Sequence, residues 1–161
     1  MGHFYFIRHG QTVWNVENKI CGATDSPLTE YGREQAKKTG QKILTEGVKA
    51  DEILCSPLSR AADTARLISE MTGIPYRVEP RLIEQNFGKW ESTPRDGKDF
   101  KKAKEFLHAV MKAENQQLRL AQRIYNLLDE IKAESDKKDL HPGCSQRNRQ
   151  SGTVLFYGYD K

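Results

Sequence analysis

The sequence predicts an α/β fold with three layers, in which a mostly parallel sheet is covered by helices on both faces. Short runs rich in β-branched and aromatic residues alternate with longer segments of helical periodicity, which is the order expected for parallel strands joined by helices. With 161 residues, 37% of them hydrophobic and 30% charged, the chain has the length of one domain and the composition of a soluble globular protein.

The first half of the chain supplies most of the predicted elements. A β-favouring run breaks at Gly10, and Thr29 is a typical residue to precede a helix. Gly47 and Gly73 stand where helices are expected to stop. The elements predicted are a strand over 3–8, a helix over 29–47, a strand over 51–55, a helix from Ser56-Pro57 to Gly73 and a strand over 76–78.

Two further helices are predicted in the second half, where residues 98–115 are lysine-rich and residues 118–135 carry apolar side chains at helical spacing. Residues 139–161 have no helical period. We therefore divide the chain into an incomplete domain at 1–138 and an atypical tail at 139–161 that we expect to be irregular. Within this tail, Thr153–Tyr157 is the segment apolar and β-favouring enough to form a strand.

Composition excludes several classes of protein. Cys21, Cys55 and Cys144 are odd in number and far apart, which argues against a disulfide framework or a zinc site and favours a cytoplasmic location. No apolar run approaches the ~20 residues that span a bilayer, and Met1–Arg8 lacks the features of a secretory leader. The net charge of +4 is mild, and basic residues alternate with acidic ones along the predicted helices, so solvated faces are favoured over nucleic-acid binding.

The segment RHGQT at residues 8–12 follows the first predicted strand, with Asn15 close behind. His9 stands at the carboxyl end of that strand, where open α/β sheets bind ligands. Arg8 is a planar cation suited to bidentate phosphate binding. Gly10 lets the backbone approach another group closely. Each of these residues alone is weak evidence, because an isolated histidine is more often structural than catalytic. The prediction of a phosphate site with a reactive histidine depends on three further segments that agree with this one.

Two more segments place charged residues after predicted strands. SPLSRAADTA at 56–65 puts Arg60 at the start of a helix, where the helix dipole adds to the side-chain charge. EQNFGKWE at 84–91 puts Glu84 in a loop beside aromatic residues, and residues 22–29 form a polar turn before a helix. The alternative interpretations are a surface helix cation for Arg60 and a solvated loop acid for Glu84.

These segments together resemble the signatures of the histidine phosphatase superfamily, in its phosphoglycerate mutase-like branch. RHGQT with Asn15, SPLSRAADTA and EQNFGKWE occur in the order and at the spacing typical of that family. The resemblance covers residues 3–93, and more loosely 118–135. FGKWE is closer to the broad-specificity phosphatases than to the glycolytic mutases, and the family usually has glycine where this chain has Ser92.

The resemblance implies that His9 attacks phosphorus and becomes a phosphohistidine, while a hydrogen bond holds its other ring nitrogen. It implies that Glu84 protonates the leaving alcohol and later activates water. Residues implied to bind the phosphoryl oxygens are Arg8, Arg60 and Asn15. Further candidate substrate contacts are Gln11, Thr12, Cys21 and Gly22. The implied partners are a small phosphorylated metabolite and a second copy in a homodimer, with no cofactor and no metal.

The C-terminal part departs from the family pattern, which places a second histidine after a late apolar strand. His141 precedes Pro142 with no apolar strand before it, so we do not assign it that role. Read from the second base of each codon, residues 138–156 can encode KTYILVAHNGIARVVQSYF, with a strand leading to a histidine at the position of Ser145. The opposite shift permits YEGGES at 111–116. Frameshifts therefore explain this C-terminal part, and a naturally divergent tail is the alternative.

Three functions remain open at this point. The first is phosphomonoester hydrolysis, or mutase-type phosphoryl transfer, through a phosphohistidine on His9 and impaired by the missing second histidine. The second is a phosphoryl-binding remnant without catalysis. The third is a phosphatase that acts on phosphohistidine in a protein partner.

Overall fold

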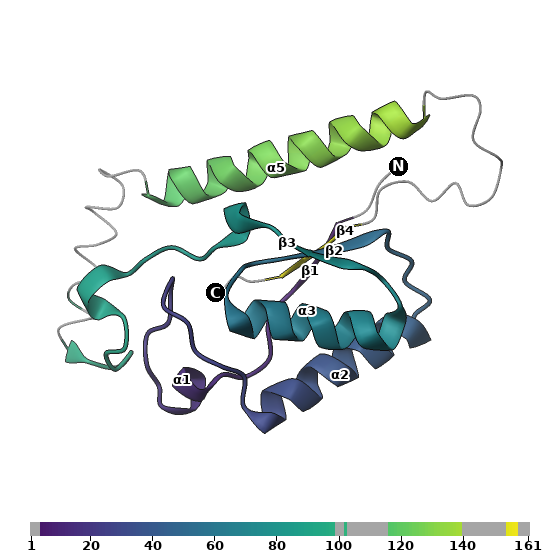
Figure 1. Cartoon of the computed structure of the whole chain (residues 1–161). Helices are drawn as coiled ribbons and strands as arrows, with labels where there is room; N and C mark the ends of the chain where they lie inside the picture. The colour runs from purple at the N-terminus through teal and green to yellow at the C-terminus, as the bar shows by residue number, and fades with distance from the viewer. Residues whose placement is uncertain (1–3, 99–101, 103–115, 140–153, 158–161) are drawn as a thin grey trace.

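The computed structural model describes residues 4–98, 102, 116–139 and 154–157, and Figure 1 shows their arrangement. The strands are β1 (Phe4–Ile7), β2 (Glu52–Cys55), β3 (Tyr76–Val78) and β4 (Val154–Tyr157). The α-helices are α1 (Val13–Val16), α2 (Glu30–Thr45), α3 (Ser59–Thr72) and α5 (Gln116–Asp139). Two short 3-10 helices, η1 (Pro80–Leu82) and η2 (Gly88–Trp90), follow β3.

The four strands pair in parallel in the order β1-β4-β2-β3. β4 therefore lies between β1 and β2, and its Tyr157 is in register with Ile7 and with Cys55. Parallel strands place their carboxyl ends along one edge of a sheet, and ligands of open α/β sheets bind at that edge. The segments that follow β1, β2 and β3 are the ones that carry His9, Arg60 and Glu84.

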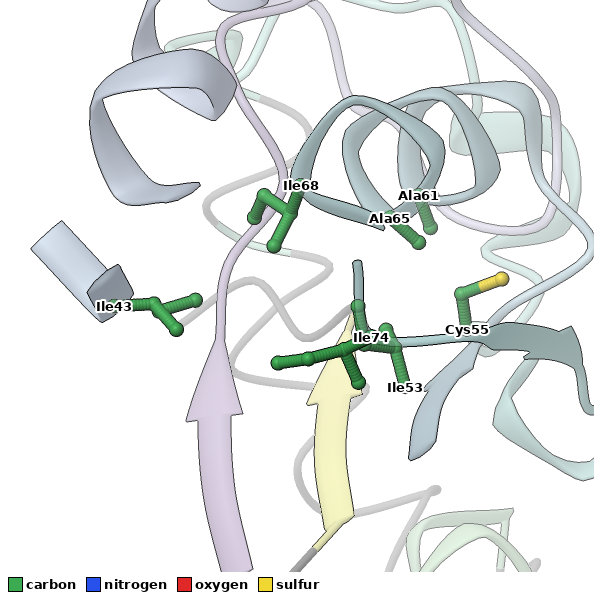
Figure 2. Close-up of a cluster of buried hydrophobic side chains, with 7 residues drawn as sticks. All are labelled: Ile43, Ile53, Cys55, Ala61, Ala65, Ile68 and Ile74. Atoms are coloured by element: carbon green, nitrogen blue, oxygen red, sulfur yellow. The ribbon is translucent and has the colours of Figure 1, made fainter. Parts of the chain in front are cut away.

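Helices α2 and α3 cover one face of the sheet (Figure 1). Side chains of a strand alternate between its two faces, so Ile53 and Cys55 of β2 face these helices while Leu54 faces away. α2 begins after Thr29, whose hydroxyl accepts a hydrogen bond from the Gly32 amide at 3.0 Å. Figure 2 shows the cluster buried at this face, which consists of Ile43, Ile53, Cys55, Ala61, Ala65, Ile68 and Ile74.

Helix α5 lies on the opposite side of the sheet (Figure 1), where Leu127 is buried against Leu54 and Leu82. A chain of ion pairs joins this helix to η1. Arg81 Nε lies 2.9 Å from Glu79 Oε1, and Arg81 Nη1 lies 2.6 Å from Glu130 Oε2 on α5. Through these contacts α5 holds the segment that leads from β3 to Glu84.

The α/β fold predicted from the sequence is confirmed, as a small parallel sheet. β1, α2, β2, α3 and β3 lie where the sequence predicts them, and α5 is longer at both ends than the helix expected over 118–135. Most of the helix expected over 98–115 lies outside the described residues. The strand expected within the tail is β4, at Val154–Tyr157, so this part of the tail is regular. The rest of the tail from residue 140 lies outside the described residues.

The short elements α1, η1 and η2 are absent from the sequence prediction because they are too short to show a period. α1 depends instead on a local capping box, in which the Thr12 side chain accepts from the Asn15 amide and the Asn15 side chain accepts from the Thr12 amide.

Candidate active site

His9 is buried two residues beyond the end of β1. Its Nδ1 lies 2.7 Å from the Gly10 carbonyl oxygen. A carbonyl oxygen can only accept a hydrogen bond, so Nδ1 carries the proton. In the neutral ring Nε2 is then the unprotonated nitrogen, which is the form in which a histidine acts as a nucleophile.

The backbone around His9 is fixed by close contact with two helices. The Gly10 amide donates to the Thr64 hydroxyl of α3 at 3.3 Å, and the Gln11 amide donates to Gln35 Oε1 of α2 at 2.8 Å. A Cβ on Gly10 would fall 2.7 Å from the carbonyl carbon of Gly32 and closer still to its oxygen. Only glycine therefore allows the loop to approach the start of α2 this closely.

Arg60 stands at the second residue of α3 and is 4% exposed. Its Nη2 donates to the Gly22 carbonyl at 2.7 Å and its Nη1 donates to the Thr24 carbonyl at 3.1 Å. Among the described residues, the carboxylate that pairs with Arg60 is that of the half-exposed Asp25, whose Oδ1 lies 3.9 Å from Nη1. The interpretation of Arg60 as a surface cation is therefore wrong, because its guanidinium is buried. A buried cation with so distant a counter-ion favours an anion nearby.

Asp25 fixes the start of α3, although it lies 34 residues earlier in the chain. Its two oxygens accept from the Ser59 amide at 3.1 and 2.9 Å, while Leu58 at the N-cap position makes no side-chain cap. The same carboxylate thus orients the helix turn that carries Arg60.

The other predicted phosphate ligands lie beside His9 in the chain. Arg8 is exposed and directly precedes it. Asn15 Oδ1 accepts from the Thr12 amide at 2.9 Å, so the carboxamide of Asn15 is oriented by the capping box of α1. Thr12 is completely buried, and its hydroxyl accepts from the Asn15 amide at 3.2 Å.

The remaining candidate substrate contacts hold loops in the structure. Gln11 Oε1 accepts from the Thr29 hydroxyl at 2.9 Å. Cys21 is buried, and its thiol donates to the Thr24 carbonyl at 3.4 Å. The Gly22 carbonyl is the one bound by Arg60. Contact of these residues with a substrate stays a prediction.

Glu84 follows η1 and is half-buried. One of its oxygens accepts from the Gln85 amide at 2.9 Å, which orients the carboxyl group along its own loop. The carbonyl of the preceding Ile83 accepts from Arg123 Nη2 of α5 at 3.2 Å. α5 therefore supports the loop that carries Glu84, through a contact between residues 40 positions apart that no local sequence pattern indicates.

Sequence reasoning missed the residues that hold the loops. Thr64 and Gly32 carry weak signals: a threonine one helical turn after Arg60, and a glycine in the first turn of a helix. Asp25 carries no local signal, because its partner Ser59 is distant in sequence. Within the described ranges no helix is long and apolar enough to cross a membrane, and no three metal-binding side chains gather.

The fold and these contacts define a class of protein, namely an α/β protein with a buried histidine and a buried arginine at the carboxyl edge of a parallel sheet, where such proteins bind ligands. The chain belongs to the histidine phosphatase superfamily (branch 1), whose family model matches residues 4–141. The family resemblance inferred from the three sequence segments is thereby confirmed, and the family is one of phosphatases and mutase-like enzymes.

Curated relatives match part of the chain. "Probable phosphoglycerate mutase GpmB" of Yersinia pestis (strain Pestoides F) is 40% identical over 92 residues, which cover 57% of this chain and 42% of the relative. The matched part is thus less than half the length of that relative.

Solved structures match nearly the whole chain. Bacillus stearothermophilus YhfR is 30% identical with a TM-score of 0.72, over 99% of this chain and 74% of that one. The mycobacterial glucosyl-3-phosphoglycerate phosphatase in complex with VO3 is 26% identical with a TM-score of 0.66, over 95% and 73%. The α-ribazole phosphatase of Shigella flexneri is 25% identical with a TM-score of 0.68, over 97% and 73%.

Proposed function

We propose that the chain hydrolyses phosphomonoesters of small metabolites, or transfers their phosphoryl group in mutase fashion, through a phosphohistidine on His9. The observation that carries the proposal is the hydrogen bond from His9 Nδ1 to the Gly10 carbonyl, because it leaves Nε2 as the attacking atom. The burial of Arg60 after β2, at the same edge of the sheet, supports a phosphoryl site there.

In the first step, the lone pair of His9 Nε2 forms a bond to phosphorus while the bond from phosphorus to the alcohol oxygen breaks. Glu84 gives its proton to that oxygen, so the alcohol leaves neutral. In the second step, Glu84 takes a proton from water, the water oxygen bonds to phosphorus and the bond to Nε2 breaks. Arg8, Arg60 and Asn15 stabilise the negative charge on the phosphoryl oxygens in both steps.

The substrate class follows from what related proteins are called. The mycobacterial and Shigella proteins are named as phosphatases of phosphorylated small molecules, and the Yersinia relative as a mutase of phosphoglycerate. We infer a small phosphorylated metabolite for this chain as well, a cytoplasmic location and a homodimer.

A second candidate is a phosphoryl-binding chain with little or no turnover. The residues directly after β4 are Gly158 and Tyr159, whereas the resemblance leads us to expect a histidine after this strand. We infer that the altered C-terminal part, from frameshifts around residues 111–116 and 138–156, removes one wall of the phosphate pocket. Loss of such a polar group lowers turnover by about 10²–10⁴.

The test compares the chain with a form whose reading frame is restored, using p-nitrophenyl phosphate as the substrate. We expect turnover by both forms, faster in the restored form by about 10²–10⁴, and a higher melting temperature for the restored form. Binding of inorganic phosphate without turnover by the chain would favour the second candidate. Equal turnover and equal melting temperature would show that the tail is a natural variant. Turnover of a protein phosphorylated on histidine, but not of the ester, would point to a protein substrate.

A further inference from the structure

The backbone of Gly22–Thr24 lies between two side chains of opposite charge. On one side, Arg60 donates to the Gly22 carbonyl at 2.7 Å and to the Thr24 carbonyl at 3.1 Å. On the other side, the Ala23 amide donates to Glu91 Oε1 at 2.9 Å and the Thr24 amide donates to Glu91 Oε2 at 2.6 Å. The carbonyls of this segment thus accept from the cation and its amides donate to the anion. Each charged side chain polarises the peptide groups and so strengthens the hydrogen bonds of the other.

Glu91 also binds the loop that contains the proposed acid. Its Oε1 accepts a third amide, that of Phe87, at 3.0 Å. Gly22 packs closely against the same loop. A Cβ at this position would lie 2.5 Å from Phe87 Cδ2 and 2.7 Å from Glu91 Oε1. One carboxylate therefore joins the segment bound by Arg60 to the loop that begins at Glu84.

The two loops continue side by side beyond Glu91. The Ser92 amide donates to the Ile20 carbonyl at 3.0 Å, and the Ile20 amide donates to the Thr93 carbonyl at 2.9 Å. Lys19 and Pro94 form an antiparallel bridge next to them. These main-chain hydrogen bonds hold the two loops together as a ladder, and Glu91 lies at the end of the ladder nearest to Arg60.

We propose that Glu91 is a positioning residue that fixes the distance between Arg60, which binds the phosphoryl group, and Glu84, which protonates the leaving group. This inference rests on the proposed function of the same site. Glu91 acts through the main chain, since the groups that it binds in the described part of the chain are the amides of Ala23, Thr24 and Phe87.

Substitution Glu91→Gln keeps the size of the side chain and removes one of its two accepting oxygens. A carboxylate offers two accepting oxygens, whereas a carboxamide offers one and turns an N–H₂ toward the remaining amides. At least one amide of the two loops then loses its acceptor, and the loops separate. We expect inorganic phosphate to bind about 10-fold more weakly, because the loss of one charge-assisted hydrogen bond is of that order.

The leaving group provides a readout that a purely structural role would not move. p-Nitrophenolate leaves without protonation, while an alkoxide such as that of glycerol phosphate needs the acid. Glu91→Gln should therefore lower kcat/KM for p-nitrophenyl phosphate by about 10-fold, because the phosphate site is weakened. It should lower kcat/KM for glycerol phosphate by about 100-fold, because displacement of Glu84 adds to the weakened phosphate site. Gly22→Ala should give the same unequal pattern, because its Cβ separates the same two loops.

The control is Glu70→Gln, which changes a carboxylate that is paired with Arg66 on the exposed surface of α3. It should leave the phosphate affinity and the ratio of kcat/KM for the two substrates unchanged.

Two outcomes would overturn the positioning role of Glu91. One is an equal loss of kcat/KM for both substrates in Glu91→Gln, in proportion to the fraction of unfolded protein. The other is an unchanged phosphate affinity in a folded variant. If the parent chain binds phosphate but never forms a phosphohistidine, the proposed function fails while the affinity measurement still decides the role of Glu91. A parent chain that binds no phosphate would overturn both.

Discussion

Substitution Gly10→Ala tests how strictly the fold positions His9. The added Cβ would lie 2.7 Å from the carbonyl carbon of Gly32 and 2.9 Å from its Cα. Carbon atoms pack at about 3.5–4.0 Å, so the two backbones must separate by roughly 1 Å. Neither partner is a flexible side chain, because the loop after β1 meets the main chain of α2.

The magnitude follows from this forced separation. Overpacking a tight contact costs about 1–3 kcal/mol, which lowers the melting temperature of a chain of this size by roughly 3–10 °C. The shift also moves the ring of His9, and a displacement of about 1 Å at a reacting group costs about 10²-fold in rate. We therefore expect Gly10→Ala to remain folded and to lose most of its activity.

Thermal melts and turnover of p-nitrophenyl phosphate check this prediction, with Gly40→Ala as the control. Gly40 lies inside α2, and a Cβ there would meet Met71 Sδ at 3.1 Å and Met71 Cβ at 3.2 Å. Met71 Sδ can move aside by rotation, whereas the contact with Met71 Cβ requires a shift of a few tenths of an ångström. This cost is offset because alanine favours a helix over glycine by about 1 kcal/mol. Gly40→Ala should therefore melt near the parent. Equal behaviour of the two variants would refute the role of the contact between Gly10 and Gly32.

Three further predictions concern stability. Ser92 adopts a left-handed φ of 68°, so Ser92→Gly should stabilise the fold by up to about 1 kcal/mol. Asn18→Gly, at a φ of 53°, should change the stability little, because asparagine tolerates this region. Equal shifts of the two melting temperatures would contradict this difference. Hydrogen bonds from Arg81 lower the pKa of Glu79 from 4.5 to about 2, so the pair stabilises the fold by about 3 kcal/mol above pH 4.5 and this is lost as the pH falls toward 2. Glu79→Gln should flatten that acid dependence in denaturant titrations, and an unchanged slope would contradict the coupling. Leu127→Ala should cost about 2–5 kcal/mol in urea unfolding, because Leu127 is 1% exposed, and a loss below about 1 kcal/mol would show that α5 packs loosely.

The fold was predictable where the sequence carries a period or a stop signal. β1 and β2 are short β-favouring runs, and α3 ends at Gly73, whose φ of 73° suits glycine. The placement of His9 and Arg60 followed from the same logic, because residues after parallel strands gather at one edge of the sheet. These two predictions needed only local sequence and the topology of the fold class.

The contacts that hold the site were not predictable in this way. Glu91 binds amides of Ala23 and Thr24, which are 68 and 67 residues away, and Asp25 binds the Ser59 amide, 34 residues away. Main-chain donors carry no residue identity, so a single sequence holds no trace of such pairs. The position of β4 between β1 and β2 is likewise a property of the folded sheet.

The position of the phosphoryl group on the histidine ring tests the central claim most directly. The hydrogen bond from Nδ1 to the Gly10 carbonyl makes Nε2 the unprotonated nitrogen of the neutral His9 ring, and therefore the nitrogen that we expect to attack. After rapid quenching in alkali, in which phosphohistidine is stable, peptide mapping and nitrogen-15 NMR locate the phosphoryl group. We predict a phosphoryl group on Nε2 of His9 that is absent in His9→Ala. A phosphoryl group on Nδ1, or on any other residue, would contradict the mechanism.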